Sequence, residues 1–235
     1  MLLRGKLAVV AGFGAGMARQ VAVSLAREGA DLVVYGGAEP VMVSAAGEIA
    51  ALGRKALCVP AAVPDRTSCN SMANRVGEIF GRVDVLVHNT ALPPTDLTRF
   101  EDADLDRWRA SMDADVFGPL VLTQAVLPLL RASADARVVI IGHHSGPIAE
   151  GHGAHSAAQA ALTSLARTLA RELGPSGIRV NVVQPAYAAA PDDAAAVRSV
   201  PTEEEVAGAV VFLASRLSKA VSGQALPVDA GLWVS

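Results

Sequence analysis

The chain is predicted to fold as an α/β protein: a doubly wound, parallel, seven-stranded sheet with helices on both faces. Short β-branched runs alternate with longer stretches of helical periodicity along its 235 residues, which is typical of parallel strands joined by crossover helices. Hydrophobic residues make up 51% of the chain and aromatic residues only 4%. This Ala-, Val- and Leu-rich composition suits strands buried on both faces. The length also suits one domain, predicted to span residues 1–235.

Seven apolar runs are predicted as strands, because each is bounded by glycine, proline or polar residues. In chain order they are Leu7–Ala11, Asp31–Tyr35, Ala56–Val59, Asp84–Val87, Arg137–Ile141, Arg179–Val183 and Leu226–Val228. Helical periodicity fills the intervals between them. The predicted helices are Gly16–Glu28, Pro40–Leu52, Arg66–Phe80, Leu105–Arg131, Ala154–Leu173 and Glu203–Ser215.

Local signals mark two helix starts and one interruption. Thr202 precedes Glu205 by three residues, the spacing of a capping box at the start of the last helix. Asp65 stands directly before the third helix and is expected to cap it. Gly118-Pro119 predicts a break inside the fourth helix, because proline lacks the N–H that a continuous helix needs. Residues 186–200, rich in Ala, Asp and Pro, are expected to be the least ordered part.

Charge and cysteine content narrow the class of protein. The net charge of −3 is spread over mixed signs without a basic stripe, which excludes an obvious nucleic-acid surface. Cys58 and Cys69 lack metal or redox spacing and fit a reducing compartment. The N-terminal run is too short for a signal peptide, and no uninterrupted apolar run reaches the ~18–20 residues of a membrane span. The sequence predicts a soluble, cytoplasmic protein without nucleic-acid or membrane partners.

Four segments carry a family resemblance over almost the whole chain. They are the glycine turn in Lys6–Ala18, the strand and Asn-Thr-Ala of Arg82–Ala91, the strand in Arg171–Pro185, and the C-terminal Glu203–Gly231. In this order and spacing they resemble the short-chain dehydrogenase/reductase family. The resemblance implies a Rossmann-type fold, an NAD(P)-dependent oxidoreductase scaffold, and the family's catalytic and cofactor-binding positions.

The resemblance places a dinucleotide site at the glycine turn. Its candidate residues are Gly12, Gly14, Gly16 and Asn89. Glycines allow the tight turn and a close approach of a pyrophosphate to a helix N-terminus, although the turn geometry alone also explains them.

Other cofactor contacts of the family are missing from the sequence. The corner after the second strand reads Tyr35-Gly36-Gly37, without an acid or a base for the ribose. The adenine-binding position falls on Ala62 and the carboxamide position on Ala190. The sequence therefore predicts no cofactor, or weak NAD(P) binding at a vestigial site.

The resemblance also places four catalytic positions. In the family a Tyr protonates the substrate, a Lys lowers the Tyr pKa, a Ser orients the carbonyl and an Asn supports a water relay. These positions fall on His155, Gln159, His143 and Asp115, with Ser145 as an alternative for the Ser. Gln159 carries no charge and cannot depress a neighbouring pKa as Lys does. The sequence predicts that standard carbonyl and alcohol redox activity has been lost.

Four of the five histidines lie between residues 143 and 155, and His88 ends the fourth strand. All are expected at the carboxyl edge of the sheet, where open α/β folds bind ligands. Asp115 is expected to raise the pKa of His155 there. Spacing suggests a metal pair at His152 and His155, but the surrounding glycines argue against a preformed site, and no metal is predicted.

Three functions fit these residues. One is a non-catalytic or ligand-binding family member. The second is a histidine-based acid–base enzyme that acts on a small organic substrate without redox chemistry. The third is an atypical NAD(P)(H)-dependent oxidoreductase with His155 as proton donor.

The predicted partners are a small-molecule ligand and further copies of the same chain. The family resemblance implies a dimer or tetramer that forms through the helices Leu105–Arg131 and Ala154–Leu173. The second of these helices is expected to present apolar residues outward, namely Ala157, Ala161, Leu165 and Leu169. An apolar face of this kind is unfavourable in water.

Overall fold

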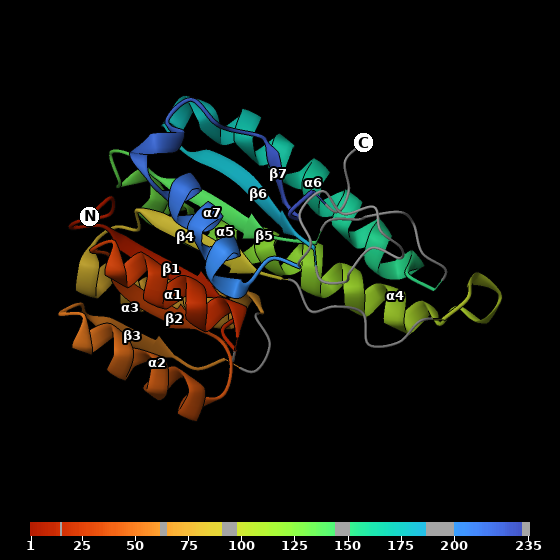
Figure 1. The fold of residues 1–235 in the computed structure, drawn as a ribbon, viewed down its shortest axis with the longest axis horizontal. Coiled ribbons are helices and arrows are strands. Elements are labelled where there is room, and N and C mark those ends of the chain that lie inside the picture. The colour runs from red at the N-terminus through yellow and green to blue at the C-terminus, as the bar shows by residue number, and fades with distance from the viewer. Residues whose placement is uncertain (15, 62–64, 91–97, 144–150, 187–199, 232–235) are drawn as a thin grey trace.

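The predicted sheet is present. A computed structural model describes the whole chain except residues 15, 62–64, 91–97, 144–150, 187–199 and 232–235. Seven strands, every neighbouring pair of them parallel, form one sheet in the order β3-β2-β1-β4-β5-β6-β7 (Figure 1). The strands are β1 Leu7–Ala11, β2 Asp31–Tyr35, β3 Ala56–Val59, β4 Val85–Asn89, β5 Arg137–Ile141, β6 Arg179–Pro185 and β7 Ala225–Val228. The predicted fold class is confirmed.

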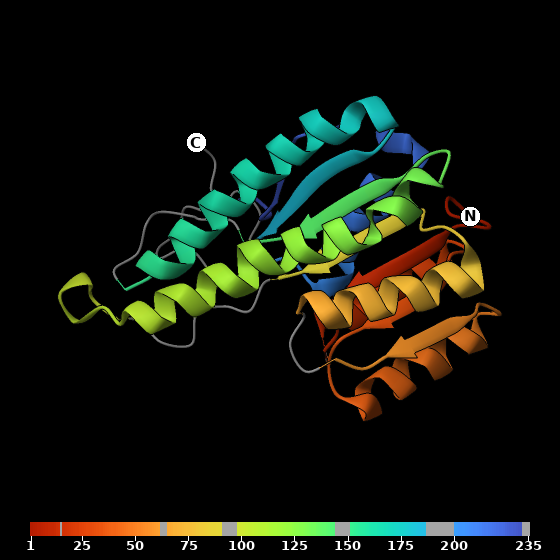
Figure 2. The same ribbon diagram turned by 180° about the vertical axis from the view of Figure 1, so that it is seen from behind.

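Helices cover both faces of this sheet (Figures 1 and 2). On one face lie α1 Met17–Arg27, α2 Glu39–Ala51 and α7 Glu203–Ala214. On the other lie α3 Arg66–Phe80, α5 Gly118–Arg131 and α6 Gly153–Leu173. The remaining helical pieces are η1 Phe100–Asp102, α4 Leu105–Met112, η2 Asp113–Phe117, η3 Gly174–Ser176 and η4 Arg216–Ser218. Figure 2 shows α4 and the start of α6 extending together beyond the sheet.

Alternating strand residues supply two separate hydrophobic cores. Val10 and Val34 face the α1–α7 side, whereas Val9 and Val33 face the α3–α6 side. All four are fully buried, as the near-continuous apolar runs require in a sheet covered on both faces. Leu169, expected on the outer face of α6, is instead buried in the second core.

Both predicted helix caps are present. Thr202 Oγ1 accepts a hydrogen bond from the Glu205 backbone N–H at 3.3 Å, and Glu205 Oε2 accepts one from the Thr202 N–H at 2.7 Å. Asp65 Oδ1 accepts from the Ser68 N–H at 2.7 Å. Residues 187–199 of the segment expected to be least ordered lie outside the described residues.

The predicted break near Gly118-Pro119 takes the form of a π-helical turn, η2, between α4 and α5. Pro119 has no N–H, so the α-helical hydrogen bond to the Asp115 carbonyl cannot form. The Gly118 N–H donates instead to the Asp113 carbonyl, five residues back. Wider turns of this kind are often found at functional sites, and this one contains the buried side chain of Asp115.

One segment of the described residues, Leu105–Arg131, is long and apolar enough to cross a membrane by length and composition. It comprises α4, η2 and α5. Within the fold α5 packs against α3 and β4, and α4 against α6. This single helix does not indicate a membrane protein.

Candidate active site

The four predicted catalytic positions meet at the carboxyl edge of the sheet. His143 follows the end of β5, Asp115 lies in η2, and His155 and Gln159 are one turn apart on α6. Asp115, His143 and Gln159 are buried, and the His155 side chain is 13% exposed. The parallel topology therefore joins residues that are far apart in the sequence.

Gln159 connects two other members of this cluster, Asp115 and His143. Its Nε2 donates to Asp115 Oδ2 at 2.9 Å, and its Oε1 accepts from the His143 backbone N–H at 2.8 Å. Gly142 permits this geometry, because a Cβ atom there would lie 2.6 Å from Gln159 Oε1. The amide is thus fixed in one orientation, with both its oxygen and its nitrogen engaged.

The two histidine rings are in direct contact. His155 Nε2 and His143 Nδ1 are 3.0 Å apart, and the ring centroids are 4.5 Å apart at an interplanar angle of 70°. The other ring nitrogen of His155, Nδ1, lies 3.8 Å from Asp115 Oδ2. The predicted neighbourhood of Asp115 and His155 is present, and the His143 contact adds a third titratable group.

Burial controls protonation at this cluster. It raises the pKa of Asp115 to about 6, against the opposing effect of the Gln159 hydrogen bond. Burial, together with His155 and His152, lowers the pKa of His143 to about 3. Burial and His152 also lower the pKa of His155. The expectation of a raised His155 pKa is therefore wrong, because burial and the neighbouring His152 both disfavour the charged ring.

His88 lies apart from this pair. Its Nε2 is 3.0 Å from Thr123 Oγ1, and burial lowers its pKa to about 3. His144 and Ser145 lie outside the described residues. Across the part of the chain that the structure describes, no group of three or more His, Cys, Asp or Glu side chains is placed to hold a metal ion.

The glycine turn and Asn89 lie against each other. Gly12 has a φ of 71°, and a Cβ atom there would lie 2.1 Å from the Asn89 carbonyl oxygen. Asn89 Nδ2 donates to the Gly12 carbonyl at 3.2 Å. Its Oδ1 is buried and accepts no hydrogen bond from the described residues.

A cavity of about 600 Å³ opens beside this turn. Gly12, His88 and Asn89 line one side of it, and Pro119 and Leu122 of α5 line the other. The unpartnered Asn89 Oδ1 needs a donor such as a hydroxyl or an amine. The turn and its neighbouring cavity therefore fit part of a dinucleotide.

The corner after β2 offers fewer groups that could bind a dinucleotide. The Tyr35 hydroxyl is held by Ser68 Oγ at 3.0 Å. Gly37 has a φ of 86°, and a Cβ atom there would lie 1.8 Å from the Phe13 carbonyl oxygen. The backbone thus excludes a side chain at Gly37, and ribose recognition there cannot follow the usual acidic pattern. Ala62 and Ala190, the other two predicted gaps, lie outside the described residues.

Comparison with known proteins identifies the family. A sequence profile described as enoyl-(acyl carrier protein) reductase matches residues 12–233. The chain belongs to the short-chain dehydrogenase/reductase family. Cyclohexanol dehydrogenase of Rhodococcus sp. (strain TK6) is 31% identical over 99% of this chain and 98% of the relative.

Other family members match with similar coverage. The 3-oxoacyl-(acyl-carrier-protein) reductase of Escherichia coli (strain K12) is 29% identical over the full length of both chains. L-rhamnose 1-dehydrogenase (NAD(P)(+)) of Sphingomonas sp. (strain SKA58) is 29% identical over 100% of this chain and 98% of the relative. Among solved structures, an NADH-dependent reductase complexed with NAD superimposes with a TM-score of 0.89 at 26% identity, covering 99% of this chain and 98% of that one.

These relatives correct two predictions. The expectation of a non-catalytic family member is overturned, because relatives that match the chain end to end are named dehydrogenases and reductases. Their names point to NAD(P)-dependent redox activity, and not to acid–base chemistry without it. The expectation of no cofactor, or only weak NAD(P), is overturned by the same relatives and by the structural neighbour that holds NAD.

The role of Gln159 does not follow from the sequence, which shows only that Gln159 lacks the charge of the family's Lys. In the structure its amide joins two elements of the site. The one sequence feature that accompanies this role is Gly142, a glycine directly after a buried strand. Its missing side chain leaves space for Gln159 Oε1.

Proposed function

We propose that this family member interconverts a secondary hydroxyl and a carbonyl on a small organic molecule with NAD(P), and that its histidine pair handles the proton. One observation carries the proposal: the 3.0 Å contact between His155 and His143, with Asp115 beside His155. Imidazoles are the commonest general acids and bases of enzymes. Dehydrogenases named for cyclohexanol and L-rhamnose support the substrate class.

The pair can accept one proton and disperse its charge. When bound, the nicotinamide supplies the two-electron acceptor or donor of the reaction. In alcohol oxidation the substrate hydroxyl must lose a proton as its carbon is oxidised, and an imidazole nitrogen of the pair takes it. The hydrogen bond between the rings lets the positive charge settle on His155, next to the Asp115 carboxylate. Reduction returns the proton along the same path.

The neutral state of the His155 ring favours the oxidative direction near pH 7. The pKa of His155 is lowered below its ordinary value of 6.5 by burial, so the ring is neutral at pH 7 and ready to act as a base. The rate of oxidation is expected to fall as the pH drops through about 6, where Asp115 becomes protonated and no longer stabilises an imidazolium, and to fall further once the pH drops through the pKa of His155.

Gln159 is proposed as a positioning residue. Its Nε2 holds the Asp115 carboxylate toward α6, and its Oε1 holds the backbone of His143. Both groups that flank His155 are therefore attached to one buried amide. Positioning of this kind contributes to catalysis without contact with the substrate.

His155→Gln tests the proton role. The variant keeps a polar side chain of similar reach but cannot titrate. We expect the kcat for NAD(P)-dependent oxidation of a panel containing cyclohexanol and L-rhamnose to fall by about 10²–10⁴-fold. Dinucleotide affinity, measured by calorimetry, should stay within about twofold, because a pure proton-transfer defect leaves ground-state binding unchanged.

His152→Gln is the matched control, because His152 precedes the first residue of α6 and is a neighbouring imidazole outside the ring contact. It should retain nearly full activity at pH 8, where His155 is neutral with or without the pKa-lowering effect of His152. A His155→Gln enzyme whose kcat stays within about threefold of wild type would contradict the role assigned to His155, since general acid–base catalysis contributes far more.

We also propose that the chain forms a symmetric dimer or tetramer through α4, α5 and α6. Leu105 is 66% exposed and Phe117 49% exposed, and Ala157 on α6 is exposed as well. Large apolar side chains exposed on neighbouring helices mark an association surface. Light scattering at micromolar concentration should give a multiple of the 24.1 kDa chain mass.

Leu105→Glu should shift this mass toward the monomer, because a buried unpaired charge opposes association. Val43→Glu, an equally drastic change at an exposed position of α2, provides the control. A monomeric mass for the wild-type chain would refute the proposed assembly.

A further inference from the structure

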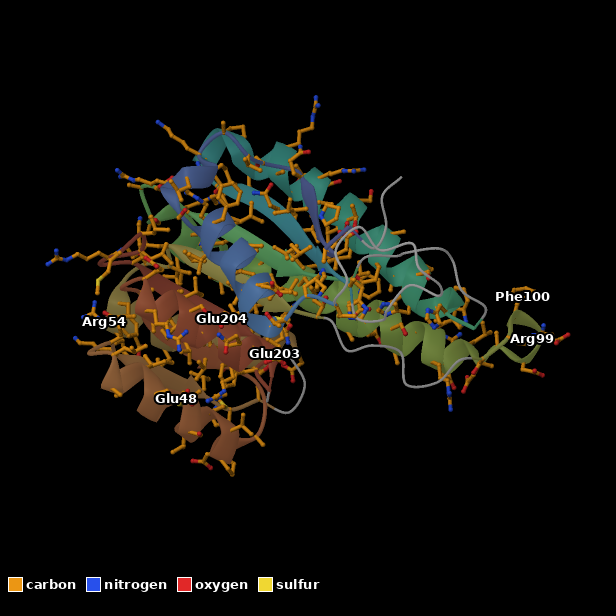
Figure 3. The ribbon with its side chains drawn as sticks, viewed as in Figure 1. Glu48, Arg54, Arg99, Phe100, Glu203 and Glu204 are labelled. Carbon is orange, nitrogen blue, oxygen red and sulfur yellow. The ribbon has the colours of Figure 1, made fainter. Side chains whose placement is uncertain are left out.

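Three successive glutamates open α7, and each lies in different surroundings. Glu205 closes the capping box with Thr202. Glu204 pairs with Arg27 of α1 at 3.5 Å. Glu203 makes no hydrogen bond or ion pair with any other described residue. Figure 3 shows Glu203 at the end of α7 that lies beside the start of α1.

The carboxylate of Glu203 reaches the glycine turn. A Cβ atom built on Gly16 would lie only 2.7 Å from Glu203 Oε1. Gly16 has a φ of 84° and directly precedes α1. The space that opens because Gly16 has no side chain is thus occupied by an acidic oxygen from another helix.

In a dinucleotide-binding turn, the space beside such a glycine is occupied by the cofactor. A glycine at this place lets the backbone approach the pyrophosphate, which lies at the positive N-terminus of the following helix. In the free chain the same positive end attracts the Glu203 carboxylate. The Glu203 carboxylate and the pyrophosphate of a dinucleotide therefore compete for the same space beside Gly16.

We propose that Glu203 sets the affinity for the dinucleotide by competing with its pyrophosphate at Gly16. The inference rests on the proposed NAD(P)-dependent function. Glu203 is exposed, and its carboxylate is the far end of a flexible side chain, so it can swing away when the dinucleotide binds. Displacement of the carboxylate from the helix N-terminus and repulsion from the phosphates both weaken binding.

Calorimetric titration of the full chain with NADH and, separately, NADPH tests this competition. We expect Glu203→Gln to bind at least about fivefold more tightly than wild type, or about 1 kcal/mol in binding free energy. Glu204→Gln removes the same charge one residue away, beside Arg27, and should bind within about twofold of wild type, as expected for an exposed, screened charge. Glu203→Asp, with its carboxylate drawn back, should fall between wild type and Glu203→Gln.

The outcomes separate this proposal from the function on which it rests. Equal affinities of wild type and Glu203→Gln, or equal gains in both glutamine variants, would overturn the role of Glu203 but leave the dinucleotide site intact. Binding of neither dinucleotide to any variant would overturn both. Inorganic pyrophosphate supplies a second probe, and it should compete with NADH more effectively in Glu203→Gln. Thermal unfolding of each variant shows that the chain is folded.

Discussion

Two buried aspartates lie at opposite edges of the sheet and differ in the sign of their pKa shift. Asp84 stands before β4 at the amino edge and is 2% exposed, whereas Asp115 lies in η2 at the carboxyl edge and is 6% exposed. The pKa of Asp84 is lowered, and that of Asp115 is raised to about 6. Burial alone therefore does not decide the charge of a carboxyl group in this fold.

The donors around Asp84 explain its low pKa. Burial raises that pKa, but hydrogen bonds outweigh it. They come from the Leu7 N–H at 2.9 Å, Ser133 Oγ at 2.7 Å and Lys6 Nζ at 3.0 Å, and Arg82 Nε lies at 3.1 Å. Two of these groups are cations, so the carboxylate is fully compensated and joins β1, β4 and the residues after α5.

Asp115 has much weaker compensation. Gln159 donates one neutral hydrogen bond, and the nearby His155 ring has a lowered pKa and is uncharged at neutral pH. Burial is the largest influence on the Asp115 carboxyl group and raises its pKa. The amino edge thus uses a buried charge for structure, whereas the carboxyl edge holds in Asp115 a carboxyl group whose pKa lies near neutral pH, and perturbed pKa values of this kind gather at functional sites.

Of the substitutions at these two aspartates, Asp84→Asn is expected to change the free energy of unfolding most. The substitution keeps the shape of the side chain but leaves Lys6 and Arg82 without their carboxylate. Loss of one partner of a buried ion pair typically lowers the free energy of unfolding by about 3–5 kcal/mol, here about 10 °C in melting temperature. Urea unfolding at pH 7 measures it.

The pH dependence of that loss sharpens the test. A lowered folded-state pKa means that Asp84 stabilises the fold above its unfolded-state pKa of about 4, and that this contribution is lost as the pH falls through the folded-state value. The gap between wild type and Asp84→Asn should therefore narrow in acid. A loss below about 1 kcal/mol at pH 7, the range of a surface pair, would show that the cluster behaves as an exposed one.

Much of this architecture follows from the sequence. Apolar runs such as Leu7–Ala11 specify strands buried on both faces, and Thr202 with Glu205 specifies a helix start. The carboxyl ends of parallel strands share one edge, so the meeting of His143, His155 and Asp115 also followed from the order of elements. Leu169 was misplaced, because the helical repeat gives a face but not the depth to which neighbouring helices cover it.

The chemistry of the site was harder to predict. The sequence shows that Asp115 is near His155 but not how much water reaches them, and burial reverses the expected shift in the His155 pKa. The partners of Gln159 lie 16 and 44 residues away, so its bridging role needed coordinates. The prediction of lost cofactor binding failed because it counted individual contacts, whereas proteins that match the whole chain are named for NAD(P) or hold NAD.

A smaller effect of opposite sign is expected from Asp115→Asn. Because the folded-state pKa of Asp115 is raised from 3.8 to about 6, the folded chain binds this proton more tightly than the unfolded chain. Asp115 therefore costs stability once the pH rises through the folded-state value, and this cost disappears in acid. The asparagine oxygen still accepts from Gln159. We expect the variant to be about 1–3 kcal/mol more stable than wild type at pH 8 and nearly equal at pH 4.

The kcat of the two asparagine variants distinguishes the carboxyl edge of the sheet from its amino edge. Without the carboxylate, an imidazolium formed on His155 loses its stabilising neighbour, so we expect Asp115→Asn to be a more stable but slower enzyme. Asp84→Asn, in contrast, should be less stable yet retain its kcat below its melting temperature. Urea unfolding at pH 8 and pH 4, with steady-state kinetics at pH 8, measures both. Destabilisation by Asp115→Asn at pH 8 would mean that its carboxylate makes net favourable contacts, and the contrast between the two aspartates would fail.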